Sequence, residues 1–388
     1  MKSSDSFSEF IEKKPLYYKE IDHQRVHKAY AILKPHIAQP LTIHIVGTNG
    51  KGSTGRIIAS LLHFSAKRVG HFSSPHILKF NERIWIEGED IDDAGLDKAH
   101  KRLYTILGEE MSNALSYFEY TTLLAFVAME ALEVIVLEAG LGGEFDATNV
   151  CSKALSVITP IGLDHQDFLG ETIGEIATTK INSIEGESVI AYQSDREVYT
   201  IAKKITQDRG TMLYRVEDFK TLYEKEYLEV KALTEQLEWS AYLFENTLTA
   251  LYSLKLVKLT YNIKDLLKIK LFGRFYKLSK NVTIDVGHNL LAAKAIVKIL
   301  AKRENRVVLI YNALNDKDYV SILKEFKPYV KRVEIITIES ERAVEQNNLE
   351  EVLTELNIPF KPFLEVNMDE EYLAFGSFYV VESFLNKI

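Results

Sequence analysis

The fold class of this chain can be inferred from one stretch, LTIHIVGTNGKGSTGRIIASLLHF, residues 41–64. Its first six residues, Leu41–Val46, are mostly apolar and β-branched, which predicts a strand, and the pattern from Lys51 to about Phe64 predicts an amphipathic helix. Between strand and helix lies a turn rich in small residues, Gly47-Thr48-Asn49-Gly50-Lys51-Gly52-Ser53. Small residues let backbone N–H groups face phosphate oxygens at the positive end of a helix. The stretch therefore predicts a phosphate-binding loop formed by residues 47–53.

Lys51 is the charged residue of this loop, and its side chain can reach the β- and γ-phosphates of ATP. The spacing is G-x-x-G-K-G-S, which differs from the Walker A spacing G-x-x-x-x-G-K-S. The alternative is an ordinary glycine-rich turn that carries a surface lysine. The strand before the loop and the helix after it favour phosphate binding.

The rest of the chain alternates short β-branched runs with helical patterns. This alternation is typical of βαβ units and predicts an α/β fold with a mainly parallel sheet. Residues 119–131 are apolar on most sides and predict a buried helix, whereas residues 216–239 give no assignment. Strands are predicted at 134–137, 155–159, 188–192 and 212–215, then at 282–285, 307–311, 333–337 and 378–381, with helices at 290–300 and 319–326.

The length of 388 residues predicts two or three domains. The βαβ series that begins near residue 281 has no glycine-rich loop of its own, so it reads as a separate domain that completes a site formed elsewhere. The segment KIKLFGRF, residues 268–275, marks the junction. We therefore predict an ATP-binding domain over residues 1–270 and a smaller, Rossmann-like α/β domain over residues 271–388.

Composition narrows the partners and the compartment. The net charge of −8 excludes a broadly basic nucleic-acid surface. The only cysteine, Cys151, excludes an intramolecular disulfide and any multi-cysteine metal site. No stretch approaches the 18 apolar residues of a membrane span, and the first residues lack the apolar core of a signal peptide. We expect a cytoplasmic protein without nucleic-acid or membrane partners.

Binding of ATP implies Mg²⁺, because the charge of the polyphosphate must be neutralised before an anionic nucleophile approaches. Glu138 closes the run VIVLEAG and His165 lies in GLDH, both at the carboxyl ends of predicted strands, where parallel sheets bind ligands. Ser74, in SSPH, is a third candidate ligand. Taken singly, Glu138 could also be a salt-bridge partner and His165 a helix-capping residue.

A series of motifs extends this picture over almost the whole chain. In order, the motifs are GTNGKGS (47–53), SSPH (73–76), FNERI (80–84), FEYTTL (118–123), EAGLGGEFDATN (138–149), GLDH (162–165), GRF (273–275), DVGHN (285–289) and GSFYVV (376–381). This series resembles the folylpolyglutamate synthase and dihydrofolate synthase family, which belongs to the Mur-type ATP-dependent amide ligases. The string GLGGEFDATN is more specific to that family than the phosphate loop is.

The resemblance implies a P-loop domain of the Mur ligase central type and a role for each matching residue. Lys51 would stabilise charge on ATP, Ser74 and Glu138 would hold one Mg²⁺, and Glu138 with His165 would share a second. Lys180 stands where the family carries a lysine carbamylated by CO₂, a modification that would convert a cation that repels metal into an anionic oxygen ligand for Mg²⁺. Its neighbours, ATTKINSI, lack the acid and the glycine that usually flank that lysine, which leaves its carbamylation open.

The resemblance also implies residues around the nucleotide and the organic substrate. Arg274 and Asp285 would contact ATP, with His288 and Asn246 near the nucleotide, although Arg274 could instead fix the linker and Asn246 could cap or pack a helix. Phe118, Glu119 and Tyr120 resemble a family motif near the pterin-bearing substrate, a flat heterocycle on which aromatic rings can stack. Core packing is the alternative for Phe118.

The predicted activity is the ATP- and Mg²⁺-dependent joining of L-glutamate to dihydropteroate or to a reduced, glutamylated folate through an acyl phosphate. The resemblance favours a monomer. The alternatives are a Mur-type ligase for another carboxylate and a nucleotide-binding regulator that keeps the fold without catalysis. The sequence does not separate dihydrofolate synthesis from glutamate-tail extension.

Overall fold

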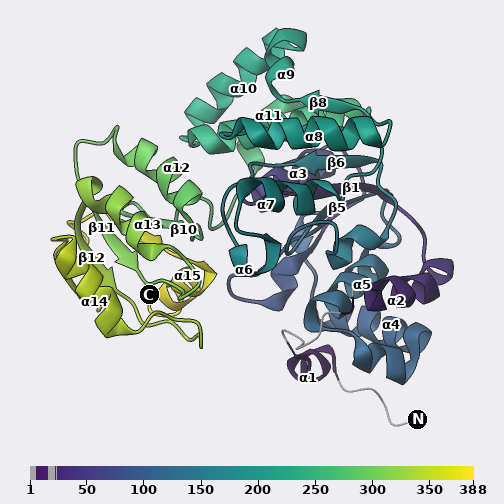
Figure 1. Cartoon of the computed structure of the whole chain (residues 1–388), viewed down its shortest axis with the longest axis horizontal. Helices are drawn as coiled ribbons and strands as arrows, with labels where there is room; N and C mark the ends of the chain where they lie inside the picture. The colour runs from purple at the N-terminus through teal and green to yellow at the C-terminus, as the bar shows by residue number, and fades with distance from the viewer. Residues whose placement is uncertain (1–5, 16–21, 23) are drawn as a thin grey trace. The chain divides into compact units, whose positions relative to one another are not determined.

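The computed structural model describes residues 6–15, 22 and 24–388, and these divide into two compact units (Figure 1). The first unit contains the described residues up to Leu233 together with Glu245–Ile269. The second contains Thr234–Phe244 and Lys270–Ile388, so it includes a segment that the sequence analysis places in the first domain.

The first unit is built on an eight-stranded sheet with the order β4-β3-β2-β5-β1-β6-β7-β8. Pairing is parallel from β2 to β8, whereas β3 runs antiparallel to both β2 and β4. The mainly parallel α/β sheet that the sequence predicts is thus confirmed. The strands are β1 (Leu41–Val46), β2 (Val69–Phe72), β3 (Ile84–Ile86), β4 (Glu89–Asp90), β5 (Val134–Glu138), β6 (Leu155–Ile158), β7 (Ser188–Ile190) and β8 (Leu213–Arg215).

Helices cover this sheet, and most were expected from their apolar patterns. Helix α5 is buried along nearly its whole length, as its uniformly apolar sequence predicts. The unassigned stretch 216–239 forms two further helices, α9 and α10. The helices are α1 (Phe7–Glu12), α2 (Arg25–Leu33), α3 (Lys51–Phe64), α4 (Asp93–Ala114), α5 (Tyr117–Met129), α6 (Gln166–Leu169), α7 (Ile173–Ile181), α8 (Arg196–Asp208), α9 (Glu217–Leu222), α10 (Glu224–Gln236) and α11 (Ala241–Leu256). The last residues of α10 and the first residues of α11 are counted in the second unit.

The second unit has a six-stranded sheet with the order β13-β12-β11-β14-β10-β9, in which only the β9–β10 pair is antiparallel. Its core includes the fully buried rings of Phe326 and Phe375, whose centroids lie 4.9 Å apart. Its elements are β9 (Tyr276–Lys277), β10 (Val282–Asp285), α12 (Leu290–Leu300), β11 (Val307–Tyr311), α13 (Tyr319–Phe326), β12 (Val330–Ile335), α14 (Gln346–Glu355), β13 (Phe360–Pro362), β14 (Tyr372–Phe375) and α15 (Phe378–Leu385).

The prediction of a strand at 378–381 is wrong, because this run forms helix α15 and the strand lies just before it as β14. Gly376 has φ +140, which ends the strand, and the Ser377 side chain then accepts a hydrogen bond from the Val380 N–H as an N-cap. A short apolar run fits a strand and a buried helix equally well, so the cap decides. Strand β12 also begins three residues earlier than predicted and ends at Ile335.

Candidate functional site

The candidate site of the first unit lies at the carboxyl ends of β5, β1 and β6. Strand β1 pairs with β5 on one side and with β6 on the other, although neither follows β1 directly in the chain. The strand order therefore reverses at β1, and parallel sheets bind ligands at such switch points. The phosphate loop follows β1, Glu138 is the last residue of β5, and the GLDH segment lies on the chain that follows β6.

The phosphate loop is held against the segment that follows β6. The N–H groups of Thr48 and Asn49 both donate to the Pro160 carbonyl, at 2.9 and 3.1 Å. A side chain at Gly47 would place its Cβ only 2.0 Å from Thr159 Oγ1, so only glycine fits there. Gly50, with φ +86, starts helix α3, whose first turn leaves N–H groups without intrahelical acceptors. Those first-turn groups, and not Thr48 and Asn49, are the donors that remain for a phosphate.

Lys51 folds back over this loop beside a buried carboxylate. Its Nζ donates to the carbonyls of Gly47 (3.2 Å) and Thr48 (3.3 Å) and lies 3.9 Å from Glu138 Oε1. Glu138 ends β5 and is only 4% exposed. The ammonium group is thus fixed next to the place where phosphates would bind, which is the charge arrangement that phosphoryl transfer requires.

The SSPH segment contacts Glu138, and the loop that contains this segment is held in place by the carboxylate of Glu82. The Ser74 N–H donates to Glu138 Oε2 at 3.4 Å. Glu82, from the FNERI motif, accepts hydrogen bonds from the N–H groups of Ile77, Leu78 and Lys79 at 2.7–2.9 Å. The sequence shows the FNERI motif, but it predicts no role for Glu82. The only indication of these hydrogen bonds in the sequence is that Glu82 lies five residues after Ile77.

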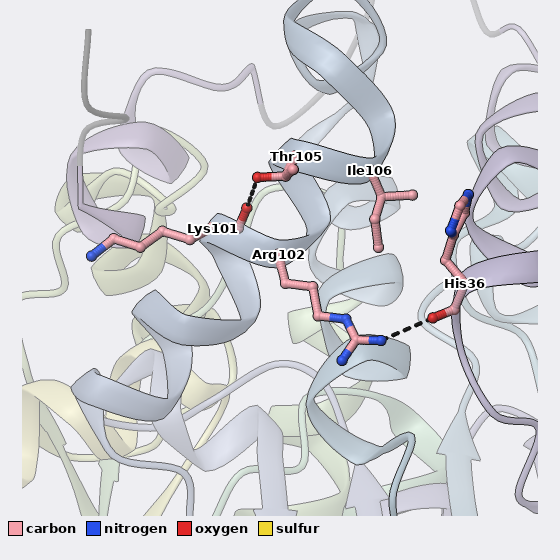
Figure 2. Close-up of a pocket in the computed structure, with 5 residues that line it drawn as sticks. All are labelled: His36, Lys101, Arg102, Thr105 and Ile106. Carbon is pink, nitrogen blue, oxygen red and sulfur yellow. Dashed lines mark hydrogen bonds between the residues drawn. The ribbon is translucent and has the colours of Figure 1, made fainter. Parts of the chain in front are cut away.

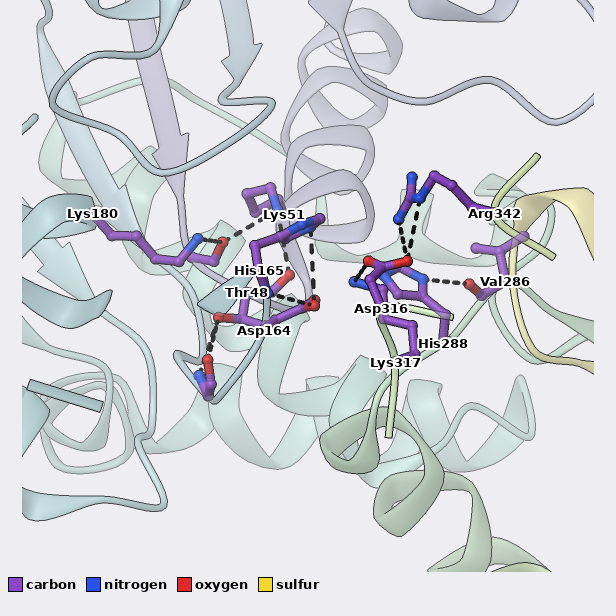
Figure 3. Close-up of polar contacts among 12 residues, drawn as sticks. Thr48, Lys51, Asp164, His165, Lys180, Val286, His288, Asp316, Lys317 and Arg342 are labelled. Carbon is purple, nitrogen blue, oxygen red and sulfur yellow. Dashed lines mark hydrogen bonds and ion pairs between the residues drawn. The ribbon is translucent and has the colours of Figure 1, made fainter. Parts of the chain in front are cut away.

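His165 occupies the N-cap position of α6 with φ 52, but its side chain makes no capping hydrogen bond. The imidazole is about one third exposed, and its Nε2 lies 4.0 Å from Oδ1 of the buried Asp164. Figure 3 shows His165 next to Thr48 and Lys51. His165 thus takes the helix-capping position by its backbone alone, and its partly exposed ring is accessible to a ligand.

The donors around Glu138 fit one of the common ways in which proteins bind Mg²⁺. This ion often takes only one or two carboxylates and completes its shell with water and substrate phosphates. The buried Glu138 beside the phosphate loop matches that mode, with the Ser74 segment in contact with it. A site built from protein side chains alone is a different case: among the described residues, no three or more His, Cys, Asp and Glu side chains gather into a metal-binding group.

Lys180 lies on α7 and is 3% exposed. Its Nζ donates to the Gly47 carbonyl at 3.0 Å, which ties this lysine directly to the phosphate loop (Figure 3). Burial, and then the positive charge of Lys51, lower the pKa of Lys180 to about 7, against the opposing effect of Asp164 and Asp146. A large fraction of its amine is therefore neutral near pH 7.

The GLGGEFDATN loop is fixed from inside by Asp146. This carboxylate accepts hydrogen bonds from the Leu141 N–H, from the Thr148 N–H and from the Thr148 hydroxyl at 2.6–2.9 Å. The Thr148 hydroxyl also lies 2.7 Å from His44 Nε2. Burial raises the pKa of Asp146, while these hydrogen bonds oppose the rise. The loop after β5 thus has one internally bonded conformation.

The three residues predicted near the organic substrate differ in their accessibility. Tyr120 is fully buried and its hydroxyl lies 2.7 Å from His100 Nδ1. Glu119 caps its own helix through the Ser116 N–H and pairs with Arg25 at 2.9 Å. Phe118 is only partly buried and lies so close to Gly140 that a Cβ there would be 2.5 Å from its ring. Phe118 is therefore the residue of this group that a ligand could reach.

Asn246, on α11, belongs with the phosphate-loop helix. Its Nδ2 donates to Ser53 Oγ at 2.8 Å, and a Cβ at Gly50 would lie 2.7 Å from its Oδ1. The packing role that the sequence left open for Asn246 is thus present. The same contact places it beside the first turn of α3.

In the second unit, Asp285 organises the GRF and DVGHN motifs around itself. Its carboxylate accepts hydrogen bonds from the Gly287 N–H (2.7 Å), the Phe275 N–H (2.7 Å) and the Tyr242 hydroxyl (3.0 Å). Burial raises the pKa of Asp285, whereas these bonds and Arg274 lower it. The contact of Tyr242 with Asp285 could not be predicted from the sequence, because the two residues are 43 positions apart.

Arg274 and His288 flank this carboxylate within the second unit. The Arg274 guanidinium lies 5.3 Å from the centroid of the Phe378 ring, and His288 Nδ1 lies 3.2 Å from the Val286 carbonyl. Nearby polar contacts drawn in Figure 3 join Arg342 and Lys317 to Asp316, at 2.6 and 3.3 Å.

A shallow hollow of about 430 Å³ lies elsewhere in the first unit, on α4 and the short helix Lys34–His36 (Figure 2). Arg102 there is already paired with Glu130 and donates to the His36 carbonyl at 2.9 Å. None of the predicted site residues lines it: the lining residues are His36, Lys101, Arg102, Thr105 and Ile106.

Comparison with known proteins gives matches over most of the chain. Residues 45–276 match the family model of the Mur ligase middle domain. A dihydrofolate synthase/folylpolyglutamate synthase of Buchnera aphidicola (subspecies Schizaphis graminum) is 31% identical over 373 residues, which are 88% of this chain and 86% of the relative.

Two solved structures share the fold. The folylpolyglutamate synthetase of Helicobacter pylori has 35% identity and a TM-score of 0.74, covering 98% of this chain and 97% of its own. Escherichia coli FolC in complex with DHPP and ADP has 25% identity and a TM-score of 0.82, covering 99% of this chain and 97% of its own.

Among the described residues, no helix is both long and apolar enough to span a membrane.

Proposed function

Because this chain belongs to the dihydrofolate synthase/folylpolyglutamate synthase family of Mur-type ligases, we propose that it joins L-glutamate to dihydropteroate or a reduced folate, using ATP and Mg²⁺. The observation that carries this proposal is the group at the carboxyl ends of β1 and β5. There, Lys51 Nζ lies 3.9 Å from the buried Glu138, over a loop that leads into a helix N-terminus. An arrangement of this kind binds a nucleoside triphosphate and polarises its phosphate groups.

The proposed reaction has two steps, because a carboxylate and an amine do not condense in water at useful rates. A carboxylate oxygen of the pterin-bearing substrate attacks the γ-phosphorus of ATP, the bond to the β-phosphate oxygen breaks, and ADP leaves. The neutral amine of glutamate then attacks the acyl carbon, the acyl C–O bond to phosphate breaks, and the nitrogen releases one proton as the amide forms and phosphate departs. Both steps gather negative charge near Lys51 and the first turn of α3, which stabilise it.

The metal ligands belong to the proposal. Ser74, Glu138 and His165 would hold Mg²⁺, and the resemblance to the family implies two ions. When bound, the metal neutralises phosphate charge and aligns the γ-phosphoryl group. Nucleotide contacts from Asn246, Arg274, Asp285 and His288, substrate contact through Phe118, and a monomeric state are further parts of the proposal.

We further propose that Lys180 is carbamylated by CO₂. The neutral amine attacks the carbon of CO₂, one proton is released, and the product is an anionic carbamate that no longer repels a cation. The pKa of about 7 supports this, because a protonated amine cannot attack. The fraction of neutral amine rises as the pH rises through that value, so the reaction is favoured at pH 8 and suppressed at pH 6.

Bicarbonate is therefore expected to raise ligase activity several-fold in enzyme prepared in CO₂-free buffer at pH 8, and to have little effect at pH 6. Lys180→Met should be nearly inactive and insensitive to bicarbonate. Lys153→Met is the matched control, because the Lys153 side chain is also only 3% exposed but pairs with Glu185. A carbamate signal in the ¹³C NMR spectrum of enzyme treated with labelled bicarbonate checks the adduct directly. Full activity of Lys180→Met would contradict the carbamate role.

The substrate is tested by product mass. Dihydropteroate and tetrahydrofolate are each incubated with ATP, Mg²⁺ and L-glutamate, and the product is expected to gain one glutamyl residue. Product from the first alone indicates dihydrofolate synthesis, product from the second alone indicates tail extension, and both indicate a bifunctional enzyme. Release of ADP without glutamate and without an amide product would refute the ligase assignment.

A further inference from the structure

Gln193 is a buried residue just beyond β7 whose side-chain amide joins two strand ends. It is 3% exposed. Its Oε1 accepts a hydrogen bond from the Ile161 N–H at 2.9 Å, and its Nε2 donates to the carbonyls of Thr159 (3.3 Å) and Ala191 (3.1 Å). The amide therefore fixes the backbone on both sides of Pro160.

The segment that Gln193 holds is the one against which the phosphate loop rests. The Pro160 carbonyl accepts the N–H groups of Thr48 and Asn49. The Thr48 hydroxyl both donates to the Gly162 carbonyl (3.0 Å) and accepts from the Gly162 N–H (3.1 Å). Moving residues 159–162 would thus move the loop that carries Lys51.

The same segment leads directly into GLDH, so one amide sets the start of two site motifs. Ile161, whose N–H Gln193 accepts, is four residues before His165. The position of Gln193 is itself fixed, because its own N–H donates to the Tyr199 hydroxyl at 2.8 Å and that hydroxyl bonds to Glu217. The network runs from α9 through α8 to the phosphate loop.

The partners of Gln193 require an amide and no other side chain of that size. One partner is an N–H group and two are carbonyls, so the side chain must accept once and donate twice. A glutamate of the same shape can accept but, when ionised, cannot donate, and it would set a buried negative charge against two carbonyl oxygens. We propose that Gln193 is a positioning residue that holds the phosphate loop in its nucleotide-binding conformation. This inference rests on the proposed function of that loop.

The test compares Gln193→Glu and Gln193→Ala with Val198→Ala in the full chain. Val198 is fully buried on the neighbouring helix α8, in the same apolar core as Ile161, so its truncation lowers stability by removing packing while it leaves the hydrogen bonds of the segment 159–162 in place. Binding of the ATP analogue AMPPNP with Mg²⁺ is measured by calorimetry, together with the melting temperature and the KM values for ATP and glutamate. We expect both Gln193 variants to bind AMPPNP about tenfold more weakly, as the loss of buried hydrogen bonds implies.

The KM for ATP should rise by a similar factor while the KM for glutamate stays within twofold, and Val198→Ala should bind the nucleotide like the wild type. If Gln193→Glu does not fold, Gln193→Ala carries the comparison. Wild-type affinity in the Gln193 variants, or an equal loss in Val198→Ala at matched melting temperature, would overturn the positioning role alone. A wild-type chain that binds no AMPPNP would overturn the proposed function as well, so the two failures are distinguishable.

Discussion

Lys51→Ala is expected to lower kcat/KM for ATP by about 10²–10³, the cost of removing one preorganised charge or donor from a developing anion. The Lys51 side chain is 14% exposed and its ammonium group is held by the Gly47 and Thr48 carbonyls, so it needs little reorganisation when phosphate charge develops. Most of the loss should appear in kcat, because the charge on the transferred group grows in the transition state. Steady-state kinetics over a range of ATP concentrations measure the division between kcat and KM.

The chain offers a matched control for this variant. Lys67 forms an ion pair with Glu133 at 3.0 Å, but both side chains are more than one third exposed. Exposed ion pairs contribute little to stability, and Lys67→Ala should leave kcat/KM for ATP unchanged. A Lys51→Ala enzyme that keeps more than a tenth of wild-type turnover would show that the loop does not use this charge.

Glu138→Gln is expected to raise the Mg²⁺ concentration for half-maximal activity by at least about 10- to 100-fold, the range seen when groups that support a metal site are changed. Glutamine keeps the shape of the side chain and can still accept the Ser74 N–H, but it removes the negative charge that attracts the cation. The Mg²⁺ titration of ligase turnover, at fixed ATP, measures the change. Excess Mg²⁺ should restore part of the activity.

The control for Glu138 lies at the other end of the same strand. Glu133 directly precedes β5, whereas Glu138 is its last residue, and Glu133→Gln removes an equal charge from the amino end. This variant should show an unchanged Mg²⁺ requirement. If Glu138→Gln lowered activity at every Mg²⁺ concentration with the same half-saturation point, Glu138 would serve only as the partner of Lys51 and would not be a metal ligand.

Much of the core of the first unit follows from local patterns. The strand Leu41–Val46 and the helix Lys51–Phe64 have the predicted bounds, because a β-branched run, a glycine with φ +86 and an amphipathic repeat each act over a few residues. The same holds for the strands β10 and β11. Where the local pattern fits two structures, as in FYVV at 378–381, the prediction fails, and the Ser377 cap selects the helix.

Local sequence patterns were enough to predict a glycine-rich loop with Lys51 after a buried strand, Glu138 at the end of a strand, and His165 on the chain that follows another strand. The groups that hold these residues in place can be identified only from the tertiary structure. Gln193 lies 32 residues from Ile161, Lys180 lies 133 residues from Gly47, and Tyr242 lies 43 residues from Asp285. A buried polar group forms hydrogen bonds with whatever donor or acceptor lies close to it in space. Local sequence patterns do not predict which distant residue that partner will be.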